Sequence, residues 1–339
     1  MRIATYNVEW FNSLFDDHGQ LLADDGPSGR YKVSRAQQIE ALGIVFTAID
    51  ADAVMVIEAP DGNRKRSTVQ ALENFAATFD LRTRNCVIGF QNHTQQEIAL
   101  LFDAHRLTAA HDPLGSDKAE AGGASPRFDG VFRWDIDVDA QSDPVQFSKP
   151  PLEIAATANG RALRLVGVHV KSKAPHGAKT PAEIMREAID NRRKQLAQCI
   201  WLRARVDEHL ARSDSLIVLG DLNDGPGLDE YEELFGRSGV EIVMGETGQA
   251  PLFDPHAHMA QSRRGGAAPA TSRFFLADQG RYLQALLDYI LVSPDLRGLD
   301  PKWRIWHPFD DPGCYNVPEL REALLTASDH FPVTLDIDL

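Results

Sequence analysis

One arrangement of elements occurs twice along this chain, and it restricts the possible folds more than any other feature of the sequence. In each copy, a strand-like segment is followed by an amphipathic helix and then by a short apolar run of strand length. The two copies comprise residues 2–8, 34–49 and 53–57, and residues 164–170, 180–210 and 215–219. Both helices open with a capping box of the form Ser/Thr-x-x-Glu/Gln, at Ser34 and at Thr180.

Polar residues stand at the strand ends of both copies. Asn7 and Glu58 are 51 positions apart in the first copy, and His169 and Asp221 are 52 positions apart in the second. A pattern that returns with this spacing predicts an internal duplication. We therefore expect an α/β protein built as a two-layer β-sandwich flanked by helices, with an active site at the edge where both sheets end.

The 339 residues are predicted to form a single domain over positions 1–339. Two stretches interrupt the pattern of elements, near residues 103–151 and 245–280, and both are rich in glycine, alanine, serine or proline. We interpret them as insertions within the domain, the first with a hairpin, rather than as linkers.

Charge and composition exclude several classes of protein. The chain has 35 Lys and Arg against 49 Asp and Glu, which gives a net charge of −14. This charge argues against a protein that binds nucleic acid non-specifically over its whole surface. No run of 18 apolar residues occurs, which predicts no membrane span. The three cysteines lie far apart and the start lacks a signal-peptide pattern, so a reducing, cytoplasmic setting is expected.

The polar residues near the ends of the predicted strands are almost all carboxylates, carboxamides and imidazoles. They are Asn7, Glu9, Glu58, Glu97, His169, Asp221, Asn223, Asp288, Asp329 and His330. Oxygen ligands without cysteine suit a hard cation, so we expect Mg²⁺ or Mn²⁺. Histidines beside acids can move protons at neutral pH. Together these groups indicate metal-dependent hydrolysis of a phosphate ester.

Six short motifs in a fixed order carry a resemblance to a known family. They are YNVEW, VMVIEAP, GVHVKSK, GDLND, LLDYILVS and SDHFPV, and they extend over nearly the whole chain. The series resembles the endonuclease/exonuclease/phosphatase superfamily, whose members include deoxyribonuclease I-like enzymes, and in particular a bacterial branch of it. The resemblance implies the deoxyribonuclease I-like sandwich fold and a divalent metal.

The resemblance also implies which residues hold the metal. Glu58 would be the main ligand, and Asn7 and Glu9 would complete the metal and phosphate site from the first strand. Glu9 stands where many members carry Asp, and its extra methylene puts the placement of the metal in doubt. Asp329 would be linked to the metal.

The remaining roles concern water and protons. By the same resemblance, Asp221 would orient or deprotonate the attacking water and Asn223 would hold the phosphate. His330, oriented by Asp288, would contact the phosphate and take or relay a proton.

A second histidine, His169, would be the acid for the leaving group in the deoxyribonuclease I-like branch. Glu97 resembles the acid that pairs with this histidine, although it could instead pair with a nearby arginine.

The substrate is left open between two classes. Lys171, Lys173 and Arg273 form local basic patches that favour a nucleic acid, most simply cleaved internally. Lys171 and Lys173 could also merely solvate a strand end. The net charge favours a small phosphoester or lipid headgroup. The inositol phosphatases are disfavoured because Leu287 and Asp288 interrupt their usual motif. A non-catalytic binding protein on this scaffold is the third alternative, and the oligomeric state is unknown.

Overall fold

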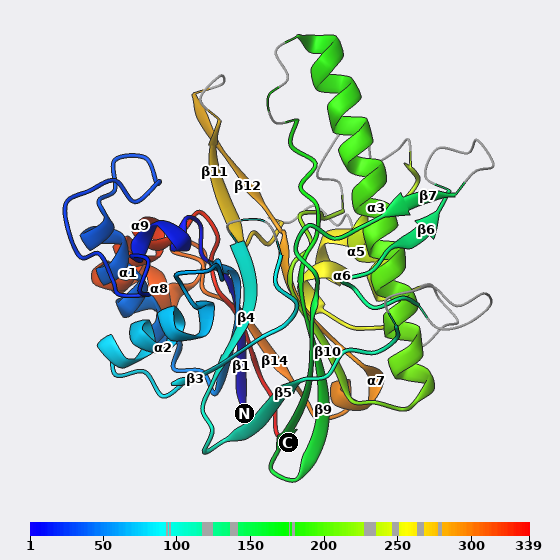
Figure 1. Cartoon of the computed structure of the whole chain (residues 1–339), viewed down its shortest axis with the longest axis horizontal. Coiled ribbons are helices and arrows are strands. Elements are labelled where there is room, and N and C mark those ends of the chain that lie inside the picture. Colours follow the sequence, from blue (N-terminus) through cyan, green and yellow to red (C-terminus); the bar gives the residue numbers. More distant parts are fainter. Residues whose placement is uncertain are drawn as a thin grey trace.

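The computed structural model describes residues 1–92, 94, 96–116, 125–135, 142–175, 177, 180–226, 235–245, 251–262, 268–276 and 280–339. Two large mixed sheets form its centre (Figure 1). The first has six strands in the order β14 (Lys302–Ile305), β15 (Val333–Asp336), β1 (Arg2–Asn7), β2 (Ala53–Pro60), β4 (Gln96–Phe102) and β3 (Asn85–Ile88). The second has five, in the order β13 (Asp288–Val292), β10 (Leu216–Asp221), β9 (Arg161–His169), β8 (Leu152–Ala158) and β5 (Leu107–His111).

Two hairpins and a set of helices complete the described part of the chain. The hairpins pair β6 (Phe132–Trp134) with β7 (Asp143–Val145), and β11 (Ser272–Leu276) with β12 (Arg281–Ala285). The helices are η1 (Phe11–Leu14), α1 (Arg35–Ile49), α2 (Thr68–Thr78), α3 (Pro181–Ala211), α5 (Gly239–Met244), α6 (Pro255–Gln261), α7 (Pro294–Arg297), α8 (Pro312–Tyr315) and α9 (Pro318–Ala327).

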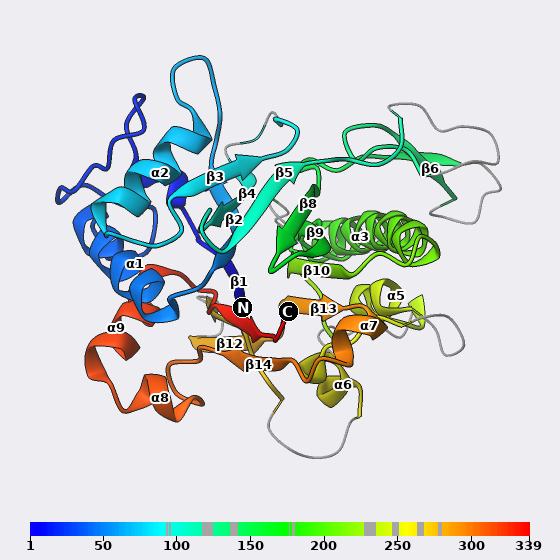
Figure 2. The ribbon, with the colours of Figure 1, turned by 90° about the horizontal axis from the view of Figure 1, so that it is seen from below.

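The two sheets pack face to face and bury an apolar core between them. Met55 and Ile57 of the first sheet lie in the same cluster as Leu165, Leu219 and Ile290 of the second. Helices cover the outer faces: α1, α2 and α9 lie against the six-stranded sheet, and α3 and α5 lie against the five-stranded one (Figure 2). This is the deoxyribonuclease I-like sandwich that the sequence predicted.

The duplicated pattern corresponds to the centre of each sheet. β1 and β2 are parallel, with Asn7 opposite Ile57, and β9 and β10 are parallel, with His169 opposite Asp221. The predicted capping boxes are present at Ser34 and Thr180, so both crossover helices begin where the sequence indicated. Because the carboxyl ends of these strands meet at one edge of the sandwich, their terminal polar residues come together there.

The segment 103–151 differs from the expected insertion. It contains β5, which pairs with β8 and forms the edge of the five-stranded sheet, so this part belongs to the sandwich itself. The expected hairpin is present as β6 and β7, on either side of residues 136–141, which lie outside the described residues. In the other expected insertion, 245–280, the described residues form α6 and β11.

No helix in the described part of the chain combines the length and the apolar character that crossing a membrane requires.

Candidate active site

A cavity of about 720 Å³ opens at the edge where the central strands end. Ten of the predicted site residues line it: Asn7, Glu9, Glu58, His169, Lys171, Lys173, Asp221, Asn223, Asp329 and His330. Residues from both sheets therefore meet in one space, as the strand-end pattern predicted. Asp288, Glu97 and Arg273 are not among the residues that line this cavity.

Asp221 lies at the centre of a hydrogen-bond network that joins the two sheets. Its Oδ2 accepts a hydrogen bond of 3.0 Å from Asn7 Nδ2, and its Oδ1 accepts one of 2.7 Å from the backbone N–H of Asn223. The side-chain Nδ2 of Asn223 also donates a hydrogen bond of 3.0 Å to the carbonyl oxygen of Val170. Burial raises the pKa of the Asp221 carboxyl to about 7, and nearby Asp288 adds to the effect.

The glycine before Asp221 explains part of the local sequence. Gly220 has φ of +135°, and a Cβ at this position would collide with the carbonyl oxygen of Val168 on the neighbouring strand. The close approach of β10 to β9 therefore requires glycine at the position before Asp221. The approach holds Asp221 at the strand end, beside the cavity.

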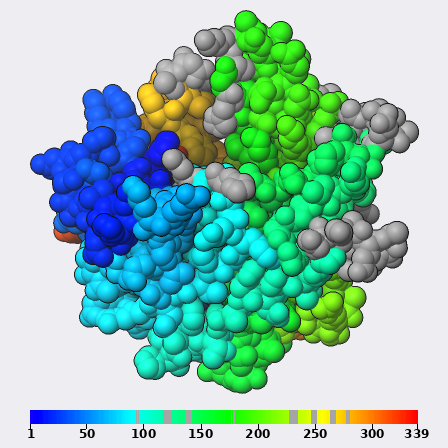
Figure 3. Space-filling view, in the orientation of Figure 1, coloured from blue at the N-terminus to red at the C-terminus, as the bar shows by residue number. Residues whose placement is uncertain are grey.

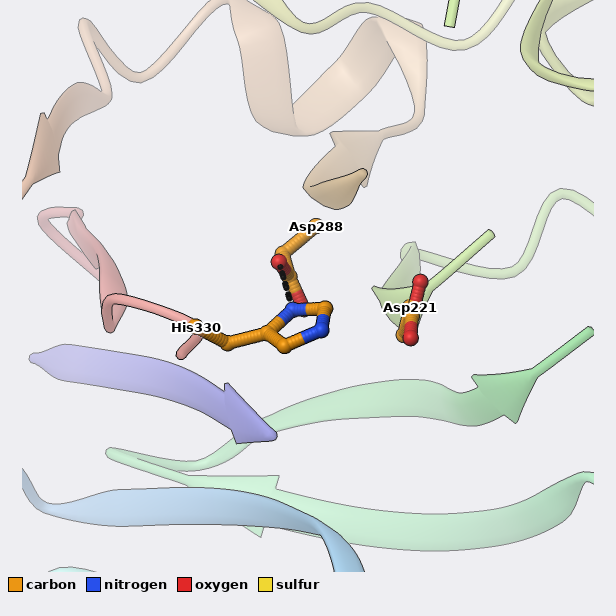
Figure 4. Close-up of side chains that lie close together, drawn as sticks. All are labelled: Asp221, Asp288 and His330. Carbon is orange, nitrogen blue, oxygen red and sulfur yellow. Dashed lines mark hydrogen bonds and ion pairs between the residues drawn. The ribbon is translucent and has the colours of Figure 1, made fainter. Parts of the chain in front are cut away.

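His330 and Asp288 form a short hydrogen bond at the edge of the site. His330 Nδ1 lies 2.7 Å from Asp288 Oδ2, and Asp221 lies beside the imidazole ring (Figure 4). Ligand atoms of these three residues lie within 4.8 Å of one another. Burial alone would lower the pKa of His330, but the carboxylates of Asp288 and Asp221 outweigh it, and the pKa is raised well above its ordinary value.

Glu58 stands at an irregularity in its strand. The pairing of β2 with β4 shifts between Ile57 and Ala59, and Glu58 has φ of +62°, which a residue with a side chain rarely adopts. The bulge turns the carboxylate into the cavity, where Gln96 donates to Glu58 Oε2. Burial raises the pKa of Glu58, so its ionised form needs a cation beside it. Backbone strain of this kind often accompanies a functional position.

Glu9 reaches the cavity from the segment that follows β1. It forms an ion pair with Arg30, and Trp10 Nε1 donates to Glu9 Oε1 at 2.9 Å. Burial raises its pKa to about 7, with Asp329 contributing, although Arg30 opposes the shift.

His169 has a partner that sequence reasoning did not identify. Its Nδ1 lies 3.1 Å from Lys149 Nζ, and its Nε2 lies 3.7 Å from Asp221 Oδ2 and 3.9 Å from Glu58 Oε1. Burial, and then the positive charges of Lys149 and His330, hold the pKa of His169 well below its ordinary value. His169 is therefore neutral at pH 7, which differs from the protonated state that a leaving-group acid needs.

Among the described residues, Glu97 forms no hydrogen bond or ion pair with this histidine. Asn92 Nδ2 donates to Glu97 Oε2 at 2.7 Å, and burial raises the pKa of Glu97 to about 7. The group beside His169 Nδ1 is Lys149 instead of the acid that the resemblance implied.

The three predicted basic residues are placed differently from one another. Lys171 and Lys173 both line the cavity, and Lys173 Nζ pairs with Asp224 Oδ1 at 2.7 Å. Arg273 lies outside the cavity, with its guanidinium 3.4 Å from the centre of the Tyr282 ring.

The polar cavity residues that the sequence analysis missed include Lys149 and Gln96. The cavity is also lined by Phe274, which packs edge-on against the His330 ring. Gln96 is the first residue of β4 and precedes the strand-like run 98–102 by two positions, which is a signal of the same kind that identified the other site residues. Lys149 precedes two prolines in an irregular stretch, and Phe274 lies in a hairpin that was not predicted.

The donor set fits a divalent cation. Asn7 Oδ1, Asp288 Oδ1 and Asp329 Oδ1 are buried and have no hydrogen-bond partner among the described residues. Buried oxygens without partners are costly, and a cation would satisfy those that face the cavity. Glu58, Glu9, Asn7 and Asp329 could hold Mg²⁺ through oxygen atoms alone. We regard Asp288 as the orienting partner of His330 rather than as a ligand, because its Oδ2 is already bonded to that ring.

Comparison with known proteins identifies the family that this fold and site define. The model of the endonuclease/exonuclease/phosphatase family matches residues 4–330, and the chain belongs to this family. None of the curated proteins compared with the sequence matches it. Members of the family hydrolyse phosphoesters.

Solved structures agree with the fold. A truncated Caenorhabditis elegans TDP2 is similar with a TM-score of 0.50 at 15% identity, over 98% of this chain and 96% of that one. Danio rerio TDP2 complexed with a single-strand DNA product is similar with a TM-score of 0.51 at 11% identity, over 100% and 99% of the two chains.

Proposed function

We propose that this chain is a Mg²⁺- or Mn²⁺-dependent phosphodiester hydrolase that cleaves nucleic acid by attack of water. The observation that carries the proposal is the meeting of acids, amides and two histidines from both sheets in one cavity. Burial raises the pKa values of three of these acids, Glu9, Glu58 and Asp221, and neighbouring carboxylates add to the rise. A bound metal ion would stabilise the ionised form of these buried carboxylates.

The cation would be held by Glu58, with Glu9, Asn7 and Asp329 around it. When bound, it supplies positive charge that neutralises the phosphate and favours attack. Glu58 is suited to this role because the bulge directs its carboxylate into the cavity. The unpartnered oxygens of Asn7 and Asp329 supply further ligand atoms.

Asp221 would hold and deprotonate the attacking water. Its pKa near 7 is the range in which a general base both accepts and releases protons at neutral pH. Asn7 and Asn223 fix the orientation of the carboxylate. Asn223 also lines the cavity, where it would hold a phosphate oxygen.

The two histidines would divide the remaining work. His330 is protonated at neutral pH because Asp288 stabilises its cation, so it would contact a phosphate oxygen and relay a proton. His169 would protonate the leaving oxygen only once an anion enters the cavity, because Lys149 and His330 hold its pKa down in the free protein.

Nucleic acid is the substrate class that the cavity wall favours. Lys149, Lys171 and Lys173 line the wall beside His169, and they form a local basic strip on a chain whose net charge is −14. The D. rerio relative carries a single-strand DNA product in its structure. With three free cysteines, the chain suits the reducing environment of the cytoplasm.

A small phosphoester is the second candidate, favoured by the net charge of −14. A long polyanion is repelled by such a surface outside the cavity, whereas a small ester is not.

The two candidates are separated by a substrate panel with matched variants. Purified protein in Mg²⁺ is given labelled single- and double-stranded DNA, RNA, nucleotides and sugar phosphates. Asp221→Asn serves as the inactive variant, and Asp80→Asn, at an acid whose side chain is 89% exposed, serves as its control. Cleavage of polynucleotides by the wild type and by Asp80→Asn alone supports the proposal. Activity confined to small esters overturns it in favour of the second candidate.

A further inference from the structure

The hairpin of β11 and β12 separates two spaces. It stands apart from both large sheets and rises from the edge that carries the active site, between the N-terminal helices and α3 (Figure 1). Residues alternate between the two faces of a strand. Phe274 and Leu283 lie on the face that lines the catalytic cavity, and Arg273, Phe275 and Tyr282 lie on the opposite face.

The opposite face borders a second cavity of about 920 Å³. Its walls are Arg273, Phe275 and Tyr282 on one side and the loop with Arg30 and Tyr31 on the other. In the space-filling view, the gold hairpin is recessed between the blue N-terminal segment and the green atoms of α3 (Figure 3). We call this second cavity the hairpin groove.

The hairpin groove continues directly into the catalytic cavity. Glu9, Phe274 and Asp329 line both spaces. Glu9 and Asp329 are two of the residues proposed to surround the cation. A chain whose phosphate lies beside these acids would therefore extend into the groove.

The walls of the groove expose large aromatic rings. Phe275 is 55% exposed, Tyr282 is 50% exposed and Tyr31 is 84% exposed. Exposed aromatic rings that gather beside a site mark a binding surface more often than rings that are scattered singly. Flat rings of this kind are the surfaces on which unpaired nucleobases stack.

A cation is held among these rings. The guanidinium of Arg273 lies 3.4 Å from the centre of the Tyr282 ring. Among the described residues, no carboxylate forms an ion pair with Arg273, whereas Arg30 is paired with Glu9. Arg273 is thus available to a phosphate, and the aromatic ring holds it in place.

We propose that the hairpin groove binds the unpaired nucleotides that flank the scissile phosphate of a single-stranded polynucleotide. Tyr282 and Phe275 would stack on bases, and Arg273 would contact a backbone phosphate. The inference rests on the proposed function and adds the form of the substrate to it. A duplex does not offer free base faces, so its bases would gain nothing from these rings.

The test compares two tyrosines of the same exposure. Tyr282→Ala removes a groove ring, and Tyr315→Ala removes a ring that is also 50% exposed and also lies under an arginine, but on α8, away from the groove. For each variant, kcat/KM is measured on a single-stranded DNA or RNA oligonucleotide, on a duplex, and on bis(4-nitrophenyl) phosphate. The last is a small diester that occupies only the catalytic cavity.

We expect Tyr282→Ala to lower kcat/KM on the single-stranded oligonucleotide by about 5- to 100-fold, as the loss of one stacked base requires. The small diester should be hydrolysed at the wild-type rate. Tyr282→Phe should restore the oligonucleotide activity, and Tyr315→Ala should match the wild type. The affinity for the oligonucleotide falls as the salt concentration rises. Arg273→Gln should make the slope of log affinity against log salt concentration less steep, by the amount that about one phosphate contact contributes.

Three results would overturn the inference, and they are distinguishable. If the wild type cleaves oligonucleotides and Tyr282→Ala does so equally well, the groove does not bind the strand, while the proposed function stands. If Tyr282→Ala loses the diester and the oligonucleotide alike, the ring only supports the cavity. If the wild type hydrolyses the diester but no polynucleotide, both the proposed function and this inference are overturned.

Discussion

Asn7 Nδ2 donates a 3.0 Å hydrogen bond to Asp221 Oδ2, although the two residues are 214 positions apart and belong to different sheets. Each stands at the carboxyl end of a central strand, β1 in one case and β10 in the other. The bond joins the two halves of the sandwich at the cavity. The geometry of the catalytic residues in this cavity therefore depends on how the two sheets pack against each other.

The first prediction concerns the base. Asp221→Asn keeps the shape of the side chain but removes the group that accepts the proton of water, so kcat should fall by about 10²–10⁴-fold. His169→Ala should cause a loss of similar size. Both side chains stand at strand ends, so thermal unfolding should remain cooperative in each variant. Wild-type rates in both would remove these residues from the mechanism.

The second prediction concerns the cation. Glu58→Gln keeps the hydrogen-bonding shape but weakens the ligand, so the Mg²⁺ concentration needed for half-maximal activity should rise at least about tenfold. Glu322→Gln, at a side chain that is 68% exposed on α9, is the control. A metal titration of both variants decides the point, and an unchanged requirement in Glu58→Gln would show that Glu58 is not a ligand.

The third prediction follows from pKa values raised by burial. In the metal-free protein, the pKa values of Glu9 and Asp221 rise from 4.5 and 3.8 to about 7. The stability from these groups is fully present below their ordinary pKa values and is lost as pH rises through about 7.

The Tm of the metal-free protein should accordingly be lower at pH 8 than at pH 6. Mg²⁺ should raise the Tm more at pH 8, because it binds ionised carboxylates and competes with protons. Differential scanning fluorimetry with and without EDTA measures this. Equal shifts at the two pH values would argue against a carboxylate metal site.

The fourth prediction concerns the histidine and its partner. Asp288→Asn removes a charge that raises the pKa of His330 against the opposing effect of burial, so that pKa should fall. Histidine resonances followed by NMR across a pH titration would show the change. The pKa of His330 should stay at its wild-type value in Asp310→Asn, a control at an acid beside His307.

The sequence predicted the centre of the fold because that part is encoded locally. The capping boxes at Ser34 and Thr180 and the apolar runs of β2 and β10 are short-range signals, and the structure places all of them as expected. β8 (Leu152–Ala158) was missed although its buried residues alternate, because it directly follows Lys149-Pro150-Pro151, a run that favours an irregular connection. Its position beside β9 is decided by packing against the rest of the sheet.

In the site, too, the residues that could be predicted are those encoded by local sequence, and the others are placed by tertiary contacts. Strand-end residues such as Asn7 and His169 could be placed together because parallel strands end at one edge. The partner of His169 could not, because Lys149 reaches it from an irregular segment that no periodicity describes. The bulge that turns Glu58 inward, with φ of +62°, is likewise a product of tertiary contacts.

Cleavage of polynucleotides in Mg²⁺ and in Mn²⁺ tests the central claim most directly, with a labelled single-stranded oligonucleotide and a supercoiled plasmid given side by side. Asp221→Asn protein is purified in parallel to exclude a contaminating nuclease. The account predicts that the wild type cleaves the oligonucleotide only when a divalent cation is present, and that Asp221→Asn leaves both substrates intact. An intact oligonucleotide and an intact plasmid with the wild type under both cations, or equal cleavage by both proteins, would contradict it.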